Sequence, residues 1–187
     1  MALHRAQIQG FFDIPVDHLQ GNPILTNYYR EKYADQLDEF VAVSPDLGSV
    51  GRTRAFATRL DIPLAIIDKR RPKANVSEIM NIIGNVDGKR VILVDDMIDT
   101  AGTICKAADM LIDNGAASVR AVATHAVLSG KAYENIEKSK LTEVIFTDSI
   151  PQKQPCSKIK VLPIAPMFAD TIRNIYEHKS ISDHFLM

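Results

Sequence analysis

Short apolar runs alternate along the chain with segments whose apolar residues recur at helical spacing. Most of the runs are apolar at nearly every position, which is typical of parallel strands covered by helices on both faces. The strand candidates are residues 40–46, 63–69, 90–96, 119–127, 143–149 and 159–165. The helix candidates are residues 22–33, 50–60, 101–115, 130–140 and 166–179. This alternation predicts right-handed βαβ units, and therefore one α/β domain over residues 1–187 with a parallel sheet between helices.

The clearest helix candidate is residues 101–115. Its apolar positions follow the i, i+3, i+4, i+7 spacing of a helix that buries one face. They are Ile104, Ala107, Ala108, Leu111 and Ile112. Gly115 follows them where a C-terminal cap belongs. The segments 70–78 and 150–158 are rich in proline and polar residues, and we predict loops there.

Polar residues cluster where the predicted strands end. These clusters are residues 44–46, 68–71, 95–96, 124–125 and 147–148. In open α/β sheets, ligands bind beyond the carboxyl ends of the strands. The sequence therefore predicts one functional site along a single edge of the sheet.

Composition narrows the class of protein. Hydrophobic residues make up 46% and charged residues 24%, and the formal net charge is -1. This balance argues against a broad surface for nucleic acid or membrane. Cys105 and Cys156 cannot form a disulfide framework and show no CxxC spacing, which favours a reducing cytoplasm. No apolar run approaches the ~18 residues of a membrane span.

The stretch VILVDDMIDTAGT, residues 91–103, combines features of an anion site. The helix expected from Ala101 would present free backbone N–H groups and the positive end of its dipole. Thr100 and Thr103 add hydroxyl donors, and Gly102 would let a ligand approach the backbone closely. Together they predict a cradle for a phosphate monoester.

Two acids precede this cradle. Asp95 and Asp96 would repel a phosphate, but they could accept hydrogen bonds from sugar hydroxyls or help to hold a cation. A sugar phosphate satisfies both halves of the stretch. A capped helix without a ligand is the simpler alternative. A receiver domain would explain the acids but would leave residues 100–103 without a role.

Other nucleotide-binding motifs do not fit. Residues 84–90, GNVDGKR, have three residues between the glycines and an arginine in place of Ser or Thr, so they form no Walker A loop. Residues 48–52, GSVGR, do not match the GxGxxG pattern of a dinucleotide site.

A basic cluster follows the second predicted strand. Residues 67–73, IDKRRPK, contain Lys69, Arg70, Arg71 and Lys73. They could form a solvated loop, or a cationic clamp for the charge that spreads over phosphate oxygens during phosphoryl transfer. His4 and Asp46 are the metal candidates, since Mg²⁺ often takes only one or two protein ligands.

Four motifs, in order, resemble the ribose-phosphate pyrophosphokinases, or phosphoribosyl-pyrophosphate (PRPP) synthetases. They are residues 3–19, 43–48, 66–78 and 92–104. The resemblance implies a fold like that of the type I phosphoribosyltransferases. It also implies synthesis of PRPP and AMP from ribose 5-phosphate and ATP, with Mg²⁺ as the cofactor. The family usually assembles as a homo-oligomer, a hexamer.

The resemblance also implies roles for individual residues. The loop that would hold the 5-phosphate is Asp99, Thr100, Ala101, Gly102 and Thr103. Asp95 and Asp96 would contact the ribose hydroxyls. His4 and Asp46 would bind magnesium. Lys69 and Arg71 would be the basic catalytic residues.

The chain also departs from the family pattern. It matches only the C-terminal half, and Ala2 stands where the family usually has aspartate, so we expect a fragment of a longer protein. Ser49 replaces a usual glycine, and residues 180–187 differ from the usual ending. Two alternatives remain open: a non-catalytic relative that binds ribose 5-phosphate or PRPP as a regulatory or assembly partner, and an ordinary phosphoribosyltransferase.

Overall fold

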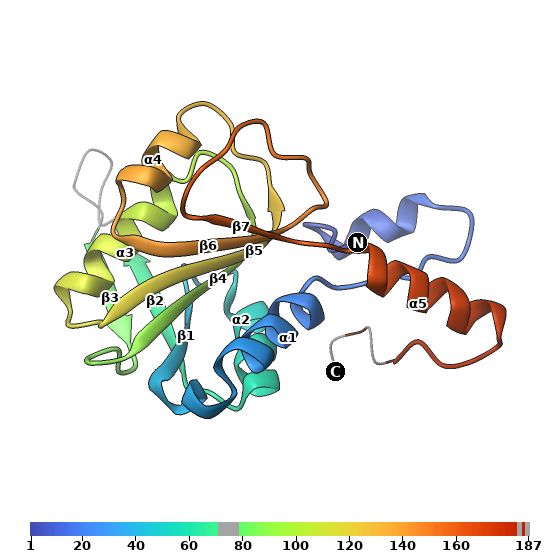
Figure 1. Ribbon diagram of the computed structural model, residues 1–187, viewed down its shortest axis with the longest axis horizontal. Coiled ribbons are helices and arrows are strands. Elements are labelled where there is room, and N and C mark those ends of the chain that lie inside the picture. The colour runs from blue at the N-terminus through green and yellow to red at the C-terminus, as the bar shows by residue number, and fades with distance from the viewer. Residues whose placement is uncertain (71–78, 183–184, 186–187) are drawn as a thin grey trace.

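A seven-stranded sheet with helices on both faces forms the body of the molecule (Figure 1). The computed structural model describes residues 1–70, 79–182 and 185. The strands are β1 (Phe40–Ser44), β2 (Leu64–Arg70), β3 (Ile79–Ile83), β4 (Arg90–Ile98), β5 (Ser118–Ala126), β6 (Leu141–Thr147) and β7 (Ile159–Leu162). The helices are α1 (Asn22–Tyr33), α2 (Val50–Leu60), α3 (Gly102–Asp113), α4 (Ala132–Lys138) and α5 (Ala165–Tyr176), with 3-10 helices η1 (Ala6–Phe11) and η2 (Ala34–Glu39).

The strand order is β3-β2-β1-β4-β5-β6-β7. Every neighbouring pair is parallel except β2 and β3, which are antiparallel. The α/β class predicted from the sequence is confirmed, but β3 was not expected. This strand is only five residues long and lies at the edge of the sheet, where Ile83 is 56% exposed.

Strand alternation divides the core into two layers. Val91 and Leu93 of β4 pack on the face covered by α3 and α4, whereas Ile92 and Val94 pack on the face covered by α1 and α2. Successive side chains of a strand point to opposite faces, so the same rule governs the acids that follow Val94.

The N-terminal segment and α5 extend from one end of the body, at the right in Figure 1. His125 of β5 helps to attach this segment, because its Nε2 lies 2.9 Å from the Ala2 carbonyl oxygen and its Nδ1 lies 2.9 Å from Ser149 Oγ. The Ala2 N–H donates to the Leu19 carbonyl at 2.7 Å. Among the helices of the described residues, none is long and apolar enough to cross a membrane.

Candidate functional site at the end of strand β4

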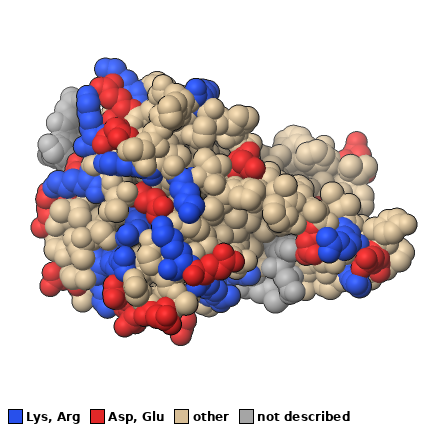
Figure 2. Space-filling view, viewed as in Figure 1, with Lys and Arg blue, Asp and Glu red and all other residues tan. Residues whose placement is uncertain are grey.

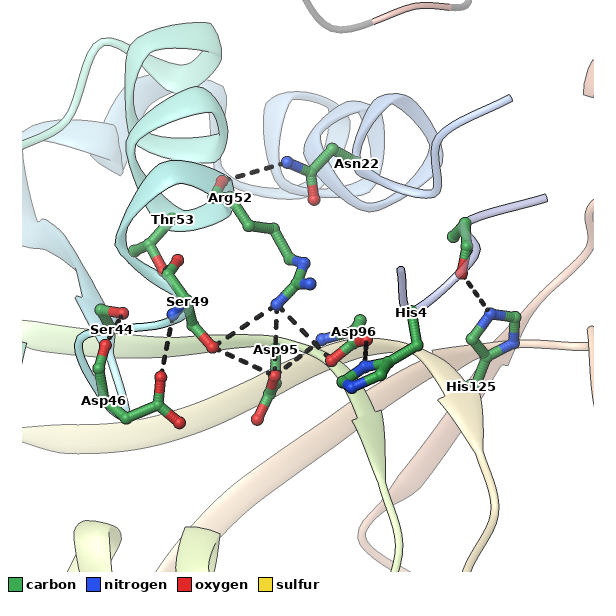
Figure 3. Close-up of polar contacts among 11 residues, drawn as sticks. His4, Asn22, Ser44, Asp46, Ser49, Arg52, Thr53, Asp95, Asp96 and His125 are labelled. Atoms are coloured by element: carbon green, nitrogen blue, oxygen red, sulfur yellow. Dashed lines mark hydrogen bonds and ion pairs between the residues drawn. The ribbon is translucent and has the colours of Figure 1, made fainter. Parts of the chain in front are cut away.

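The acids of β4 diverge because they are neighbours in a strand. Asp95 continues the series of Val91 and Leu93, on the α3 side, whereas Asp96 continues that of Ile92 and Val94, on the α1 and α2 side. Both lie at the carboxyl half of β4 (Figure 3). The two side chains therefore leave the strand toward opposite faces, while both carboxylates stay within 3.5 Å of Arg52 Nη1.

Asp96 is held by two basic side chains. Its Oδ2 lies 2.5 Å from His4 Nδ1, and its Oδ1 lies 3.5 Å from Arg52 Nη1. Burial opposes ionisation of Asp96, but the His4 hydrogen bond and the Arg52 charge outweigh it and lower the pKa of this carboxyl. Asp96 is thus a buried carboxylate whose charge is compensated within the chain.

Asp95 has weaker compensation. Its Oδ1 accepts hydrogen bonds from the Asp96 N–H at 2.9 Å and from Arg52 Nη1 at 3.3 Å, and Ser49 Oγ lies 3.4 Å away. Burial, together with the neighbouring Asp96, raises the pKa of Asp95 to about 6, and Arg52 opposes that rise. Asp95 is therefore charged at neutral pH and titrates close to it.

Arg52 links the two acids, and sequence reasoning missed it. Figure 3 shows its guanidinium between Ser49, Asp95 and Asp96. It lies in the first turn of α2, and the Asn22 side chain donates to its carbonyl at 3.2 Å. A signal was available, because Arg52 follows Ser49 by three positions and so shares its helix face.

A cavity of about 250 Å³ opens on the α3 side of β4. Its lining brings together the ends of β1 and β4 and the loop that leads into α3. The lining residues are Pro45, Asp46, Asp95, Met97, Ile98, Asp99, Thr100, Ala101, Thr103 and Ile104. The cavity thus joins carboxylates, hydroxyls and the N-terminus of a helix, where backbone N–H groups lack partners.

The turn into α3 differs in detail from the prediction. The left-handed residue is Ala101, with φ 61°, and the helix begins one residue later than expected, at Gly102. A Cβ on Gly102 would meet only Thr100 Oγ1, at 3.9 Å. The tight backbone turn therefore falls on Ala101, and Gly102 leaves the approach to the helix end open.

The loop before α3 is anchored to the segment around α4. Ser129 Oγ donates to Asp99 Oδ1, and the Ser129 N–H donates to the Asp99 carbonyl at 3.2 Å. The Asn135 side chain donates to the Thr100 carbonyl at 3.0 Å. Asp99 therefore has a structural partner that the sequence did not reveal, and its carboxylate helps to position the cradle.

Asp46 follows β1 and is another of the residues that line the cavity. Its Oδ1 accepts the Ser49 N–H at 2.8 Å, and Ser44 Oγ donates to its carbonyl at 2.7 Å. These bonds fix the turn between β1 and α2. In Figure 3, Asp95 and Asp96 lie between Asp46 and His4.

Comparison with known proteins identifies the family. Residues 69–186 match the model of the phosphoribosyl synthetase-associated domain. The chain is 56% identical over 187 residues to a ribose-phosphate pyrophosphokinase of Caldanaerobacter subterraneus subsp. tengcongensis, covering 99% of this chain and 58% of the relative. The chain belongs to the ribose-phosphate pyrophosphokinase family.

Further relatives of the family support this assignment. The ribose-phosphate pyrophosphokinase of Clostridium tetani is 57% identical over 187 residues, covering 99% of this chain and 58% of the relative. The crystal structure of phosphoribosylpyrophosphate synthetase from Mycobacterium smegmatis aligns with a TM-score of 0.83 at 44% identity, covering 94% of this chain and 57% of that one. The chain spans less than two thirds of the length of these family members.

The candidate magnesium ligands suit a site with few protein ligands. Within residues 1–70, 79–182 and 185, no three His, Cys, Asp or Glu side chains cluster so as to hold a metal. Mg²⁺ commonly uses one or two carboxylates together with substrate phosphates and water. Asp46 at the cavity wall suits that pattern, and the bond from His4 Nδ1 to Asp96 is one that metal-binding histidines commonly make through the ring nitrogen that does not hold the metal.

The predicted basic residues lie at the limit of the described chain. Lys69 is the penultimate residue of β2, and its backbone is in register with Met80 of β3. The side chain of Lys69 and the whole of Arg71 lie outside the described residues. The catalytic role assigned to both by resemblance to the family stays a prediction.

Proposed function

We propose that this chain provides the ribose 5-phosphate site of a ribose-phosphate diphosphokinase. The reaction would transfer pyrophosphate from ATP to O1 of ribose 5-phosphate and release PRPP and AMP. The observation that carries the proposal is the cavity shared by Asp95 and the turn into α3, since a carboxylate suited to sugar hydroxyls lies there beside a helix end suited to a phosphate. Membership of the family supports the same reaction.

Each wall of the cavity has a part in this proposal. The 5-phosphate would accept hydrogen bonds from the N–H groups at the start of α3 and from the hydroxyls of Thr100 and Thr103. The Asp95 carboxylate, ionised above its pKa of about 6, would accept hydrogen bonds from the ribose hydroxyls. Asp96 would contribute indirectly, because its carboxylate is already bonded to His4 and Arg52. Through this contact Asp96 holds Arg52 within reach of Asp95.

The pyrophosphate would then be transferred to O1 of the bound ribose 5-phosphate. The O1 hydroxyl would attack the β-phosphorus of ATP and lose its proton to water, an O1–P bond would form, and the bond between the β-phosphorus and the oxygen bridging to the α-phosphate would break to release AMP. Magnesium, held by Asp46 and the substrate phosphates, would supply charge neutralisation when bound. Lys69 and Arg71 would stabilise the charge that develops on the transferred group.

A homo-oligomeric assembly is part of the proposal. The N-terminal segment exposes Phe11 by 87% and Ile14 by 70%, and α5 exposes Ile172 by 65% and Tyr176 by 85%. Large apolar side chains gathered in this way favour burial against another protein surface. Contact with further copies of the chain would cover them.

The first test is calorimetric titration of the chain with ribose 5-phosphate. Thr103→Val removes a cavity hydroxyl and should weaken binding about five- to twentyfold, as the loss of a hydrogen bond to a charged group predicts. Thr58→Val, on the exposed face of α2, is the matched control and should bind normally. Equal affinity of both variants would remove α3 from the site.

The second test separates the catalytic proposal from its non-catalytic alternative. The chain is incubated with ribose 5-phosphate, ATP and Mg²⁺, and AMP is measured. AMP formation that depends on ribose 5-phosphate supports the diphosphokinase. Ribose 5-phosphate binding without AMP would instead support a binding or regulatory role for this chain.

A further inference from the structure

One peptide group near the start of the chain is held from two sides by histidine rings. The carbonyl oxygen of Ala2 lies 2.9 Å from His125 Nε2, and the N–H of Leu3 donates to His18 Nε2 at 2.6 Å. This carbonyl and this N–H belong to the same peptide bond. His125 is on β5, whereas His18 lies in the N-terminal segment, residues 1–21, so the two rings come from different parts of the chain. Together these rings form a histidine clamp.

The two rings of the histidine clamp must carry their protons on different nitrogens. A carbonyl oxygen only accepts, so His125 Nε2 carries a proton, and the Ser149 hydroxyl, 2.9 Å from Nδ1, can donate to the other ring nitrogen. A backbone N–H only donates, so His18 Nε2 is unprotonated. Burial, and then the positive amino terminus, lower the pKa of His18, which keeps this ring neutral at pH 7 and able to accept. One ring therefore donates and the other accepts.

The backbone of Ala2 needs the support of its neighbours. Its φ is 42°, in the left-handed region that residues other than glycine rarely adopt, and Ala2 is 7% exposed. Such a conformation persists only where surrounding contacts hold it. The Ala2 N–H donates to the Leu19 carbonyl at 2.7 Å, and the histidine clamp holds the peptide group that follows.

The far end of the N-terminal segment also lies against β5. Gly21 is packed so closely on Thr124, the residue before His125, that a Cβ on Gly21 would lie 2.1 Å from Thr124 Oγ1. Figure 2 shows few charged side chains on the surface over the N-terminal segment, above α5 in this view. The attachment of the segment therefore depends on close packing and hydrogen bonds more than on surface charge.

We propose that the histidine clamp positions His4 against Asp96. A peptide group is planar, so fixing both its carbonyl and its N–H fixes its orientation. Only the two soft dihedrals of Leu3 then separate the clamped peptide group from the one that precedes His4. Figure 3 shows His4 bonded to Asp96 beside the bond that His125 makes to the N-terminal segment.

His4 needs this support because its side chain is 52% exposed. An exposed ring loses conformational freedom when it is fixed in one position, and a backbone that is already ordered reduces this cost. His4 in turn belongs to the bonded row of Asp96, Arg52 and Asp95 that reaches the sugar-phosphate cavity. His125 and His18 are therefore positioning residues, which act on the proposed site through His4.

The first test determines which ring nitrogens carry protons. The chain is labelled with ¹⁵N, and long-range ¹H–¹⁵N NMR spectra of the histidine side chains are recorded at neutral pH. We expect His125 to be protonated at Nε2, and His18 to be protonated at Nδ1 alone. A proton on His18 Nε2, or an unprotonated His125 Nε2, would overturn the proposal without any substitution in the chain.

The second test removes the donor of the histidine clamp and measures the result at His4. In His125→Ala the Ala2 carbonyl loses its donor, so the ¹⁵N signal of His4 Nδ1 and the ¹³C carboxyl signal of Asp96 should move toward the values of unbonded groups. In His125→Gln the side-chain amide can donate to the same carbonyl, so both signals should return most of the way.

His18 offers the matching pair of variants. His18→Ala removes the acceptor of the Leu3 N–H and should shift the same two signals, whereas His18→Gln provides an amide oxygen and should restore them. His178→Asn, which changes an exposed histidine beyond α5, is the control and should leave both signals in place. Backbone amide signals of β4 and β5 show that each variant is folded.

The outcomes separate positioning from a general structural role. Unchanged His4 and Asp96 signals in folded His125→Ala and His18→Ala would overturn the proposal, and so would alanine and glutamine variants that behave alike. Ribose 5-phosphate should bind about threefold more weakly to His125→Ala, as the loss of one hydrogen bond predicts. This last effect rests on the proposed function, whereas the His4 and Asp96 signals do not, so failure of the proposed function is distinguishable from failure of the histidine clamp.

Discussion

His4 Nδ1 lies 2.5 Å from Asp96 Oδ2, so a residue near the start of the chain contacts a carboxylate 92 positions later. The contact depends on the attachment of Ala2 to His125 and Leu19, which holds the N-terminal segment against the sheet. It also determines the environment of β4, because Asp96, once bonded to His4 and Arg52, holds Arg52 within reach of Asp95.

Replacing His4 should therefore change the titration of Asp96. In His4→Asn, the burial of Asp96 remains while the opposing hydrogen bond is lost, so the pKa of Asp96 should rise. Carboxyl ¹³C NMR across pH measures this directly. His178→Asn, at an exposed residue with φ 55°, is the control and should leave Asp96 unchanged. An unaltered Asp96 titration in His4→Asn would contradict the role given to this contact.

Asp95 should make the protein less stable as pH rises from about 4 to about 6. Its pKa is raised to about 6 in the folded chain, above the unfolded value near 3.9, so the folded state binds more protons in that interval. Asp95→Asn should increase the free energy of unfolding at pH 7 by about 1–3 kcal/mol, with a smaller gain at pH 4. Urea unfolding at both pH values measures it, and the exposed Asp109→Asn should show neither effect.

Arg52 should stabilise the fold through two carboxylates. Arg52→Gln leaves Asp95 and Asp96 without their shared cation and should lower the free energy of unfolding at pH 7 by about 1–2 kcal/mol, a figure discounted because the Arg52 side chain is 28% exposed. The loss should shrink at low pH, where the carboxyls are protonated. Arg54→Gln, exposed on the same helix, serves as the control. An equal loss of unfolding free energy in both variants would show that the substitutions act on helix α2 itself and not through Asp95 and Asp96.

Ser129 should act on substrate binding from outside the cavity. Ser129→Ala removes the hydroxyl that donates to Asp99 Oδ1, so the loop before α3 should lose order and ribose 5-phosphate should bind about threefold more weakly. Calorimetry gives the affinity. Ser157→Ala removes a comparable serine–carboxylate bond, to Glu137, and should leave the affinity intact. If both variants bind alike, Asp99 is not positioned through Ser129.

The Tyr29 hydroxyl should be dispensable for stability. It is buried without a partner, so Tyr29→Phe should leave the free energy of unfolding unchanged or raise it by up to about 1 kcal/mol. Tyr133→Phe is the matched comparison, because the Tyr133 hydroxyl bonds to Gln152 and to the Lys153 N–H. That variant should lose about 0.5–1.5 kcal/mol in thermal or urea unfolding. A clear loss in Tyr29→Phe would mean that the hydroxyl has a partner in solution.

Much of the architecture could be predicted from local pattern. The apolar runs and the periodicity of residues 101–115 predicted the central strands and α3 with small errors at their ends, because buried strands and helix faces follow their own periods. The edge strand β3 was missed, because a short apolar run such as its IMNII does not distinguish a strand from a helix segment. The left-handed backbone of Ala101 was not predicted either, because alanine carries no local signal for such a conformation.

The sequence by itself determined the order of the elements and the edge of the sheet where the cradle and the acids lie, because periodicity and strand direction are local properties of the chain. Only the tertiary structure decided that Asp95 faces the cavity while Asp96 is bonded to His4, and that Arg52 joins them. It also decided that Arg120 is a buried cation in register with Glu143 of the neighbouring strand. These are contacts between residues far apart in the chain, and they depend on how strands and helices pack.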